Sequence, residues 1–233
     1  MRKLLLLLFL GMMAQFSTAQ DKNFSYLDIF DLQYASDPQI SPDGEWVVYR
    51  RMGFDIMNDG SAGNLWLIKA DGSQNQKLTA REVNESNPRW SPSGDRIAFT
   101  SSTDEGSEIY MYWVGTGKVA KLTQLPFSPS SLTWSPDGTE LAFSMNVPQD
   151  PPVIAKIPAK PKGAKWEEAP RITDRLYHEA DGRGYIAPGF NHIFVVPANG
   201  GAPRQVTSGD WHHRGTLSWG KDGSKIYFSA NRV

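Results

Sequence analysis

Runs of β-branched and aromatic residues separated by glycine-containing turns recur along most of the chain. The clearest turn consists of an apolar residue, Ser-Pro, Asp or Ser, and Gly, and an apolar run follows it. Proline presets the second position of a type I turn and glycine is favoured at the fourth, so the motif predicts a tight turn between two strands. The four copies, the last with Gly-Lys in place of Ser-Pro, are Ile40–Gly44, Trp90–Gly94, Trp134–Gly138 and Trp219–Gly223.

The first three copies are followed by a third apolar run, another glycine turn and a short run that ends in threonine. The third run starts 13 positions before the apolar residue of the fourth in every copy: 65 to 78, 109 to 122 and 193 to 206. Four strands in about 45 residues is the period of a propeller blade. The sequence therefore predicts an all-β fold, a partial (open) β-propeller of about three and a half four-stranded blades.

The connection between the second and third strands is the interval that varies. We expect a polar loop at 52–63 in the first blade and an insert at 146–191 in the third. Within the insert, proline-rich residues 147–170 predict an extended excursion, 171–177 a strand-like segment and 181–185 a tight loop. A degenerate extra blade in this region is the less favoured alternative, because only one strand pair follows it.

These intervals also predict the domain organisation. The predicted boundaries are a signal peptide at 1–19, a lead-in at 20–36, a partial propeller at 37–233, blade 1 at 37–80, blade 2 at 87–124, blade 3 at 131–208 and the start of blade 4 at 216–233. Ser25 and Asp28 form a predicted capping pair for a short helix in the lead-in. The tryptophans before the turns are expected in the core between blades, because they offer large apolar area. An open arc also leaves an unpaired strand edge, which predicts marginal stability of the chain alone.

The N-terminus has the pattern of a secretory signal peptide. Arg2 and Lys3 precede an apolar run at 4–13, and small residues at 17–19 offer a cleavage site before Gln20. The run is shorter than the ~20 residues of a membrane helix, so an uncleaved anchor is the less favoured alternative. We therefore expect a periplasmic or secreted protein without a membrane association after cleavage.

Composition narrows the partners further. Without Arg2 and Lys3, 22 of the 24 basic residues remain against 25 acidic ones, so the net charge moves from −1 to −3. No basic stripe indicates a nucleic-acid partner. The chain has no cysteine, which excludes disulfides and lipid-modified cysteine.

Three stretches carry a resemblance to a known family. They are Ala35–Gly44, then Asp55–Asp59 ahead of Asn64–Leu67, and Ile172–Tyr185 before His192–Val196. From about residue 27 to the end, the chain resembles the N-terminal propeller of secreted prolyl oligopeptidase family serine peptidases, in the acylaminoacyl-peptidase and dipeptidyl-peptidase-like branch. More broadly, the blades look like those of TolB-like and other WD-type propellers.

The resemblance implies a closed propeller followed by a C-terminal α/β-hydrolase domain whose serine lies in Gly-x-Ser-x-Gly. The implied partner is a short peptide substrate, which reaches that domain past the propeller. This sequence contains no Gly-x-Ser-x-Gly, so no catalytic residue can be carried over, and we expect a scaffold and substrate-gating role without activity of its own. The alternative is a stand-alone periplasmic propeller for protein binding.

The densest polar cluster of the insert is His178, Asp181, Arg183 and Tyr185. We expect these residues to line a substrate route or to face the other domain, where Arg183 would meet a carboxylate. The alternative is an exposed turn without a function.

No cofactor or metal site is predicted. We expect the four histidines of the chain to be surface or loop residues rather than parts of a Ser-His-Asp site. Neighbouring His212 and His213 point to opposite sides of an extended segment and rarely bind one metal together. The loop at 55–60 lacks the ligand spacing of an EF-hand.

Overall fold

The computed structural model describes residues 23–150, 153, 158–167, 172–173, 175–181 and 184–232. The predicted signal peptide and Arg183 lie outside the described residues. A 3₁₀ helix η1 (Tyr26–Asp31) opens this part of the chain, and Ser25 and Asp28 form a capping box at its start. The predicted capping pair and short helix are therefore confirmed.

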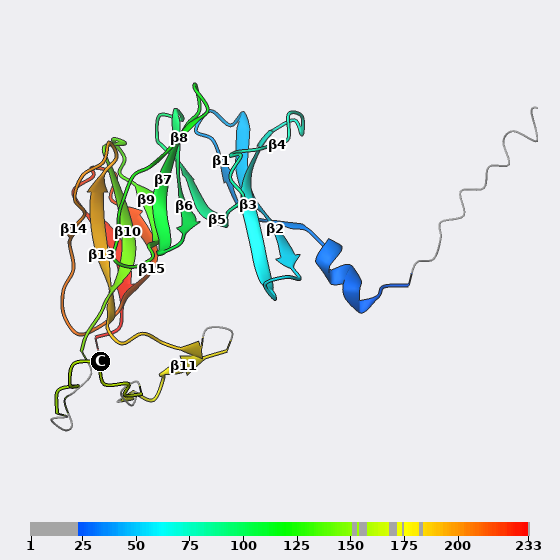
Figure 1. The fold of residues 1–233 in the computed structure, drawn as a ribbon. Helices are drawn as coiled ribbons and strands as arrows, with labels where there is room; N and C mark the ends of the chain where they lie inside the picture. The colour runs from blue at the N-terminus through cyan, green and yellow to red at the C-terminus, as the bar shows by residue number, and fades with distance from the viewer. Residues whose placement is uncertain are drawn as a thin grey trace, which may run out of the picture.

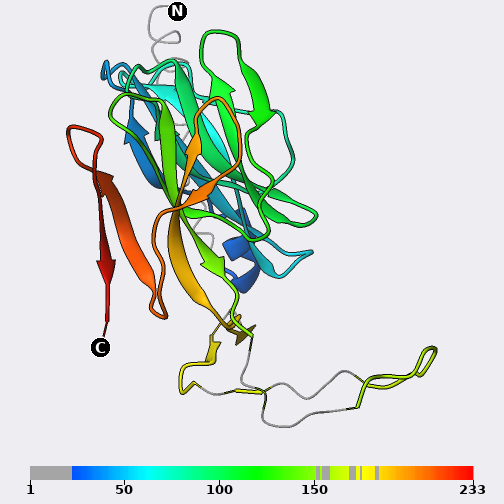
Figure 2. The ribbon, with the colours of Figure 1, turned by 90° about the vertical axis from the view of Figure 1, so that its left-hand side faces the viewer.

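Four antiparallel sheets follow one another along the chain and form an open arch (Figures 1 and 2). The first sheet contains β1 (Tyr34–Ile40), β2 (Trp46–Asp55), β3 (Gly60–Lys69) and β4 (Gln76–Lys77). The second contains β5 (Glu85–Trp90), β6 (Arg96–Thr103), β7 (Gly106–Trp113) and β8 (Lys118–Lys121). The third contains β9 (Ser130–Trp134), β10 (Glu140–Val147), β13 (Phe190–Pro197) and β14 (Arg204–Gln205). The last contains β15 (His213–Trp219) and β16 (Ile226–Ala230).

The strand order confirms the predicted fold class. Each complete sheet pairs its strands in sequence, as a propeller blade does, and the described sheets do not close into a ring. In the third sheet β10 pairs directly with β13 at eight positions, from Glu140–Pro197 to Val147–Phe190. The chain therefore leaves this sheet after Val147 and returns to it at Phe190, with the insert between.

The predicted polar loop at 52–63 is wrong, because β2 and β3 continue through it. They pair at ten positions, from Trp46–Lys69 to Asp55–Gly60, and leave a turn of four residues. The small residues at the start of β3 are not typical of a strand, so the sequence pattern did not predict one here. Met52 lies opposite Gly63, and a Cβ at Gly63 would come within 2.6 Å of the Met52 sulfur. Gly63 thus makes room for the long side chains of β2 to lie across β3.

The turn serines have a second role that the turn rules do not state. The Ser135 hydroxyl donates to Asp137 Oδ1 at 2.6 Å and accepts the Glu140 N–H at 2.9 Å, while Gly138 adopts φ +71°. The hydrogen bonds to the Asp137 carboxylate, first of all the one from Ser135, lower its pKa. Ser41 makes equivalent contacts in the first sheet.

The hydrophobic core lies between neighbouring sheets. One cluster joins the first and second sheets around Leu65 and Phe99, a second joins the second and third around Phe143, and a third joins the third and fourth around Val195. Trp134 is 7% exposed within the second cluster, as predicted for a core residue. Each sheet is thus stabilised by its neighbours, as in other repeat proteins.

Threonines that follow the short fourth strands hydrogen-bond the third strands. Thr123 Oγ1 accepts the Ile109 N–H at 3.0 Å and donates to Glu108 at 2.7 Å. Thr207 Oγ1 accepts the Ile193 N–H at 2.9 Å in the same way. For the first sheet, part of this role belongs to the buried Glu85 carboxylate on β5 of the second sheet, which accepts the Leu65 N–H and the Thr79 hydroxyl. Burial raises the pKa of Glu85. Side chains therefore satisfy backbone groups of the third strands where the ladder ends.

Candidate functional site

The predicted site residues that are described lie on a short hairpin of β11 (Glu179–Ala180) and β12 (Gly184–Tyr185). The His178 and Tyr185 rings lie 6.3 Å apart, and the Ile186 N–H donates to the His178 carbonyl at 2.8 Å. Asp181 follows β11 in the turn. His178, Asp181 and Tyr185 are all exposed. The structure thus brings His178 and Tyr185 together; Arg183 lies outside the described residues.

The hairpin lies beyond the ends of β10 and β13, away from the four sheets (Figures 1 and 2). The predicted strand-like segment at 171–177 is wrong in its described part. Residues 172–173 and 175–177 form no strand, and pairing begins only at Glu179. The chain bends at Arg175 and Leu176, and the Arg175 side chain reaches the end of the third sheet.

Arg175 and Gly189 form the root of the insert. Arg175 donates to the Gly189 carbonyl and to Gln149 Oε1, both at 3.2 Å, and its guanidinium lies 4.5 Å from the Phe190 ring centre. Gly189 is buried and adopts φ +121°. These contacts tie the returning chain to the end of the third sheet.

Past this root, the insert exposes large apolar side chains. Leu176 is 103%, Tyr177 69% and Tyr185 57% exposed. Apolar side chains gathered on one exposed segment mark an interaction surface more often than isolated ones do. The insert therefore combines a fixed root with an accessible apolar hairpin, the arrangement of a loop that contacts another molecule or domain.

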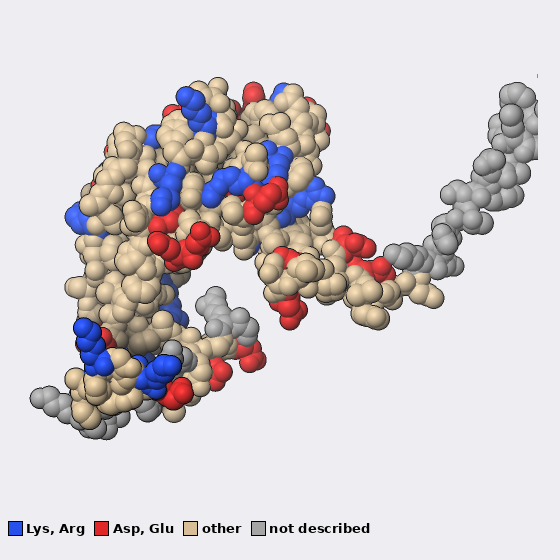
Figure 3. Space-filling view, in the orientation of Figure 1, with Lys and Arg blue, Asp and Glu red and all other residues tan. Residues whose placement is uncertain are grey.

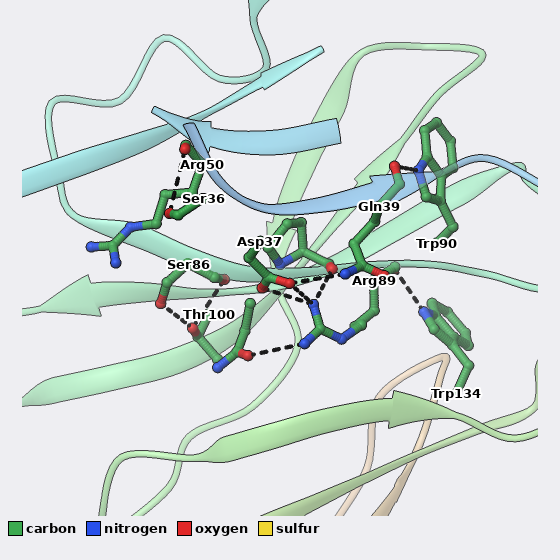
Figure 4. A network of polar contacts seen from close by, with 11 residues as sticks. Ser36, Asp37, Gln39, Arg50, Ser86, Arg89, Trp90, Thr100 and Trp134 are labelled. Atoms are coloured by element: carbon green, nitrogen blue, oxygen red, sulfur yellow. Dashed lines mark hydrogen bonds and ion pairs between the residues drawn. The ribbon is translucent and has the colours of Figure 1, made fainter. Parts of the chain in front are cut away.

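A second polar cluster joins the first strands of the first two sheets (Figure 4). Arg89 Nη1 donates to both Asp37 carboxylate oxygens at 2.9 and 3.0 Å, and Gln39 Nε2 donates to Asp37 at 2.9 Å. Asp37 adopts φ +47° at a bulge in β1, and Asn87 adopts φ +55° at the matching bulge in β5. These bulges turn the two side chains of the ion pair towards each other.

The tryptophans of the turn motif also join neighbouring sheets. Trp90 Nε1 donates to the Gln39 carbonyl at 3.0 Å, and Trp134 Nε1 donates to the Arg89 carbonyl at 2.9 Å. Each acceptor lies on the first strand of the preceding sheet, two residues before its turn serine. Trp219 departs from this rule: its indole N–H is buried and has no hydrogen-bond partner among the described residues. The junction between the third and fourth sheets therefore lacks the tryptophan hydrogen bond of the first two junctions.

The ion pair between Arg89 and Asp37 should couple the first two sheets. Unfolding in urea of Arg89→Met, Asp37→Asn and the double variant should give a coupling energy of about 1 kcal/mol, because both side chains are only 26–30% exposed. Asparagine tolerates the positive φ of position 37. The matched control is the pair of Lys77 and Glu82, whose glutamate is 87% exposed, and it should show no measurable coupling. A larger coupling in the control pair would contradict this role of the Arg89 pair.

The expectation of surface or loop histidines is wrong for two of the four. His192 is 5% and His213 1% exposed, and their ring centres lie 5.1 Å apart. His192 points inward from β13 at the register position that Glu108 occupies in β7, which accounts for its burial. The hydroxyl that His192 contacts belongs to Thr207, at 3.3 Å. Thr207 corresponds to Thr123, which donates to Glu108 in the second sheet, so the contact of His192 with Thr207 is part of the blade structure.

Charge and membrane features add little to the site. Lys and Arg side chains are interspersed with Asp and Glu on the face shown in Figure 3. No helix in the described part of the chain is long and apolar enough to cross a membrane. Among the described residues, no three His, Asp or Glu side chains are grouped so that they could hold a metal ion.

Comparison with protein families matches two successive parts of the chain. Residues 28–157 match the TolB beta propeller domain, and residues 172–233 match the dipeptidyl peptidase IV (DPP IV) N-terminal region. The second match begins inside the insert and includes the β11–β12 hairpin. The apolar hairpin is therefore in the part of the chain that resembles a peptidase.

Individual relatives agree with both matches. The chain is 26% identical over 205 residues to the uncharacterized peptidase YuxL of Bacillus subtilis, which covers 88% of this chain and 30% of the relative. Acylaminoacyl peptidase of Pyrococcus horikoshii superposes with a TM-score of 0.57 at 16% identity, over 85% of this chain and 28% of that one. Putative TolB of Agrobacterium tumefaciens gives 0.52 at 19% identity, over 87% and 60%.

The two solved structures show the likeness of fold. This chain spans about 30% of the length of the Bacillus subtilis relative. Together with the two family matches, these similarities confirm the resemblance to peptidase propellers and to TolB that the sequence predicted.

Proposed function

Because this chain belongs to the TolB β-propeller family through residues 28–157, we propose that it is the propeller portion of a secreted serine peptidase of the prolyl oligopeptidase family. It is a propeller domain similar to the N-terminal region of peptidases and to TolB. The proposed reaction of the whole protein is hydrolysis of short peptides by a serine in an α/β-hydrolase domain. The dipeptidyl peptidase IV match and the relative named as a peptidase support this class.

The role proposed for this chain is scaffold and substrate gate. The observation that carries it is the insert of the third sheet, with its root fixed by Arg175 and its apolar hairpin exposed. A loop on a rigid scaffold can contact a substrate or another domain without disturbing the core. Tyr177, His178 and Tyr185 offer aromatic faces and polar tips, which suit contacts with a peptide.

In this proposal the chemistry of the reaction belongs to the hydrolase domain and not to this chain. The sequence has no Gly-x-Ser-x-Gly, and His178 lies on the exposed hairpin with its Nδ1 3.2 Å from the Leu176 carbonyl. The other three histidines lie at the junction of the third and fourth sheets, where their hydrogen bonds go to backbone groups, a threonine and a tryptophan. A Ser-His-Asp arrangement needs a serine at hydrogen-bond distance from the histidine and a carboxylate on its other nitrogen.

Peptide hydrolysis tests the gate directly. The 233-residue chain should not cleave dipeptide or tripeptide chromogenic substrates, whereas the whole protein that contains it should. In the whole protein, the informative ratio is kcat/KM for a peptide of about 20 residues divided by kcat/KM for a dipeptide. The double variant Tyr177→Ala/Tyr185→Ala should change this ratio by about three- to tenfold. The control is Tyr26→Ala, a tyrosine 84% exposed on η1, which should leave the ratio unchanged.

Two outcomes would contradict the proposal. Turnover by the 233-residue chain alone would place the chemistry here. Absence of peptidase activity in the whole protein would remove the peptidase class.

Secretion is proposed from the N-terminal pattern alone. Protein recovered from the periplasm or medium should begin at Gln20 on N-terminal sequencing. Recovery of the protein with Met1 from the cytoplasm would contradict this part.

The second candidate is a stand-alone periplasmic propeller for protein binding, which the TolB match favours. The coding sequence of the whole protein separates the two candidates. Further blades followed by Gly-x-Ser-x-Gly favour the peptidase, and blades without a hydrolase domain favour the binding protein.

A further inference from the structure

Histidines supply polar contacts at the junction between the third and fourth sheets, beside the apolar cluster around Val195. The first two junctions each use a tryptophan hydrogen bond, but the corresponding Trp219 N–H has no partner among the described residues. Gly215 adopts φ +87° where β15 departs from regular pairing. The contacts that replace the tryptophan bond come from His212, just before β15, and from His213, its first residue.

Both histidines bind the backbone of one residue, Asn191. The Asn191 N–H donates to His212 Nδ1 at 3.1 Å, and the Asn191 carbonyl lies 3.3 Å from His213 Nδ1. Trp211 Nε1 donates to His213 Nε2 at 3.2 Å. Asn191 is two residues past Gly189, so these contacts tie the root of the insert to the fourth sheet.

These contacts define the protonation of both rings. His212 Nδ1 is an acceptor, so its proton is on Nε2. His213 Nε2 is an acceptor, so its proton is on Nδ1, from which it donates to the Asn191 carbonyl. These contacts therefore require opposite tautomers of the two neighbours. An imidazolium has no acceptor nitrogen, so protonation of either ring removes one of these hydrogen bonds.

We propose that His212 is the pH-responsive part of a latch, which it forms with His213 and which holds Asn191 of β13 against the start of the fourth sheet when His212 is neutral and weakens when His212 is protonated. The latch acts at Asn191 whether or not the whole protein is a peptidase. Release would separate the start of the fourth sheet from Asn191. It would leave the β10–β13 pairing intact, and also the first two sheet junctions, since these use tryptophan and arginine contacts.

The surroundings favour the neutral form of the His212 ring. Burial, and after it Arg214, Arg175 and the two other histidines, lower the pKa of His212. Burial, and after it His213, lower the pKa of neighbouring His192, while Asp210 opposes this. Arg232 lies 5.3 Å from the Trp211 ring centre and adds another positive charge beside the latch.

The sign of the pH effect follows from these directions. In the folded protein the pKa of His212 is below its ordinary value of about 6.5. Above about pH 6.5 the His212 ring is neutral in both the latched and the open state, and the latch has its full stability. As the pH falls below about 6.5, the open state binds a proton before the latched state does, so the latch loses stability with acidification.

Hydrogen exchange at the Asn191 amide reports on the latch, because this N–H is the one bound to His212. After correction for intrinsic exchange, its protection in the 233-residue chain should fall by up to about tenfold for each pH unit below about 6.5, as His212 is protonated. The Ile109 amide, bound to Thr123 in the second sheet, is the internal control and should keep its protection. Equal changes at both amides would mean global acid unfolding and would overturn the proposal.

Two further measurements keep the proposal testable. Ring ¹⁵N shifts at pH 7.5 should show opposite tautomers for His212 and His213; identical tautomers would overturn it.

His212→Asn places a non-titrating acceptor near Nδ1, so it should retain more Asn191 protection than His212→Ala at pH 7.5 and respond less to acid than the wild type. His178→Asn on the exposed hairpin should leave the acid response unchanged. An unaltered acid response in His212→Asn would contradict the latch.

Discussion

Replacing Gly189 by alanine is expected to destabilise the protein by about 2–5 kcal/mol, measured by urea unfolding. Gly189 has φ +121°, where an L-residue is strained by about 1–3 kcal/mol. A Cβ here would lie 2.2 Å from the Val147 carbonyl oxygen and 2.8 Å from the Pro148 Cα. Both atoms belong to the backbone at the end of β10, so they cannot move away as a side chain would. Overpacking of this kind adds about 1–3 kcal/mol.

The control for this variant is Gly184→Ala in the β11–β12 hairpin. Gly184 also has positive φ, +65°, but a Cβ there meets nothing within 4 Å. This substitution should cost about 1–2 kcal/mol, the penalty of the left-handed conformation alone. Equal losses in both variants would show that contact with the end of β10 contributes nothing to the root of the insert.

The blades could be predicted because their signals are local and repeated. Proline and glycine define each turn within five residues, and the constant spacing between the third and fourth strands revealed the period. The loop at 52–63 could not be predicted in this way. Gly60 and Gly63 resemble loop residues, yet the side chains of β2, such as Met52, use the space that glycine leaves.

The insert shows the limit of local patterns more clearly. Residues 171–177 have strand-like composition, but the described part forms no strand, and Arg175 binds Gly189 and Gln149 instead. Such contacts join residues that are distant in the sequence, so a window of neighbouring residues does not contain them. The exposed position of His178 and Tyr185, in contrast, followed from the glycine-rich turn between β11 and β12.

Buried His192 could have been found by aligning the repeats. It directly precedes the first apolar residue of its third strand, as Glu108 does in the second sheet, and both contact the threonine two residues after the fourth strand. The ion pair of Asp37 and Arg89 had no such signal. It depends on bulges with positive φ at non-glycine residues, which the amino-acid types do not reveal.

The sheets and the insert therefore have different physical requirements. The sheets need large apolar areas between them, whereas the insert needs only its root at Arg175, Gly189 and Asn191. Changes at the root should alter the insert locally, and changes between sheets should alter the whole domain. Gly189→Ala and Phe143→Ala separate these cases.

Phe143→Ala is expected to destabilise the domain by about 3–5 kcal/mol. Phe143 is 0% exposed and stacks on Phe194 with ring centres 5.7 Å apart. It belongs to the cluster that joins the second and third sheets, together with Met111 and Trp134. Truncation would leave a cavity between two sheets that stabilise each other, so the loss should appear as a lower urea midpoint of the whole domain.

The control is Phe127→Ala, which removes the same side chain at a position 41% exposed. It should cost less than about 1 kcal/mol, because little apolar area is withdrawn from the core. Phe99→Ala at the junction of the first and second sheets should match Phe143→Ala, since Phe99 is also 0% exposed and stacks on Tyr110 at 5.9 Å. If Phe143→Ala cost no more than Phe127→Ala, the stability of this domain would not depend on packing between sheets.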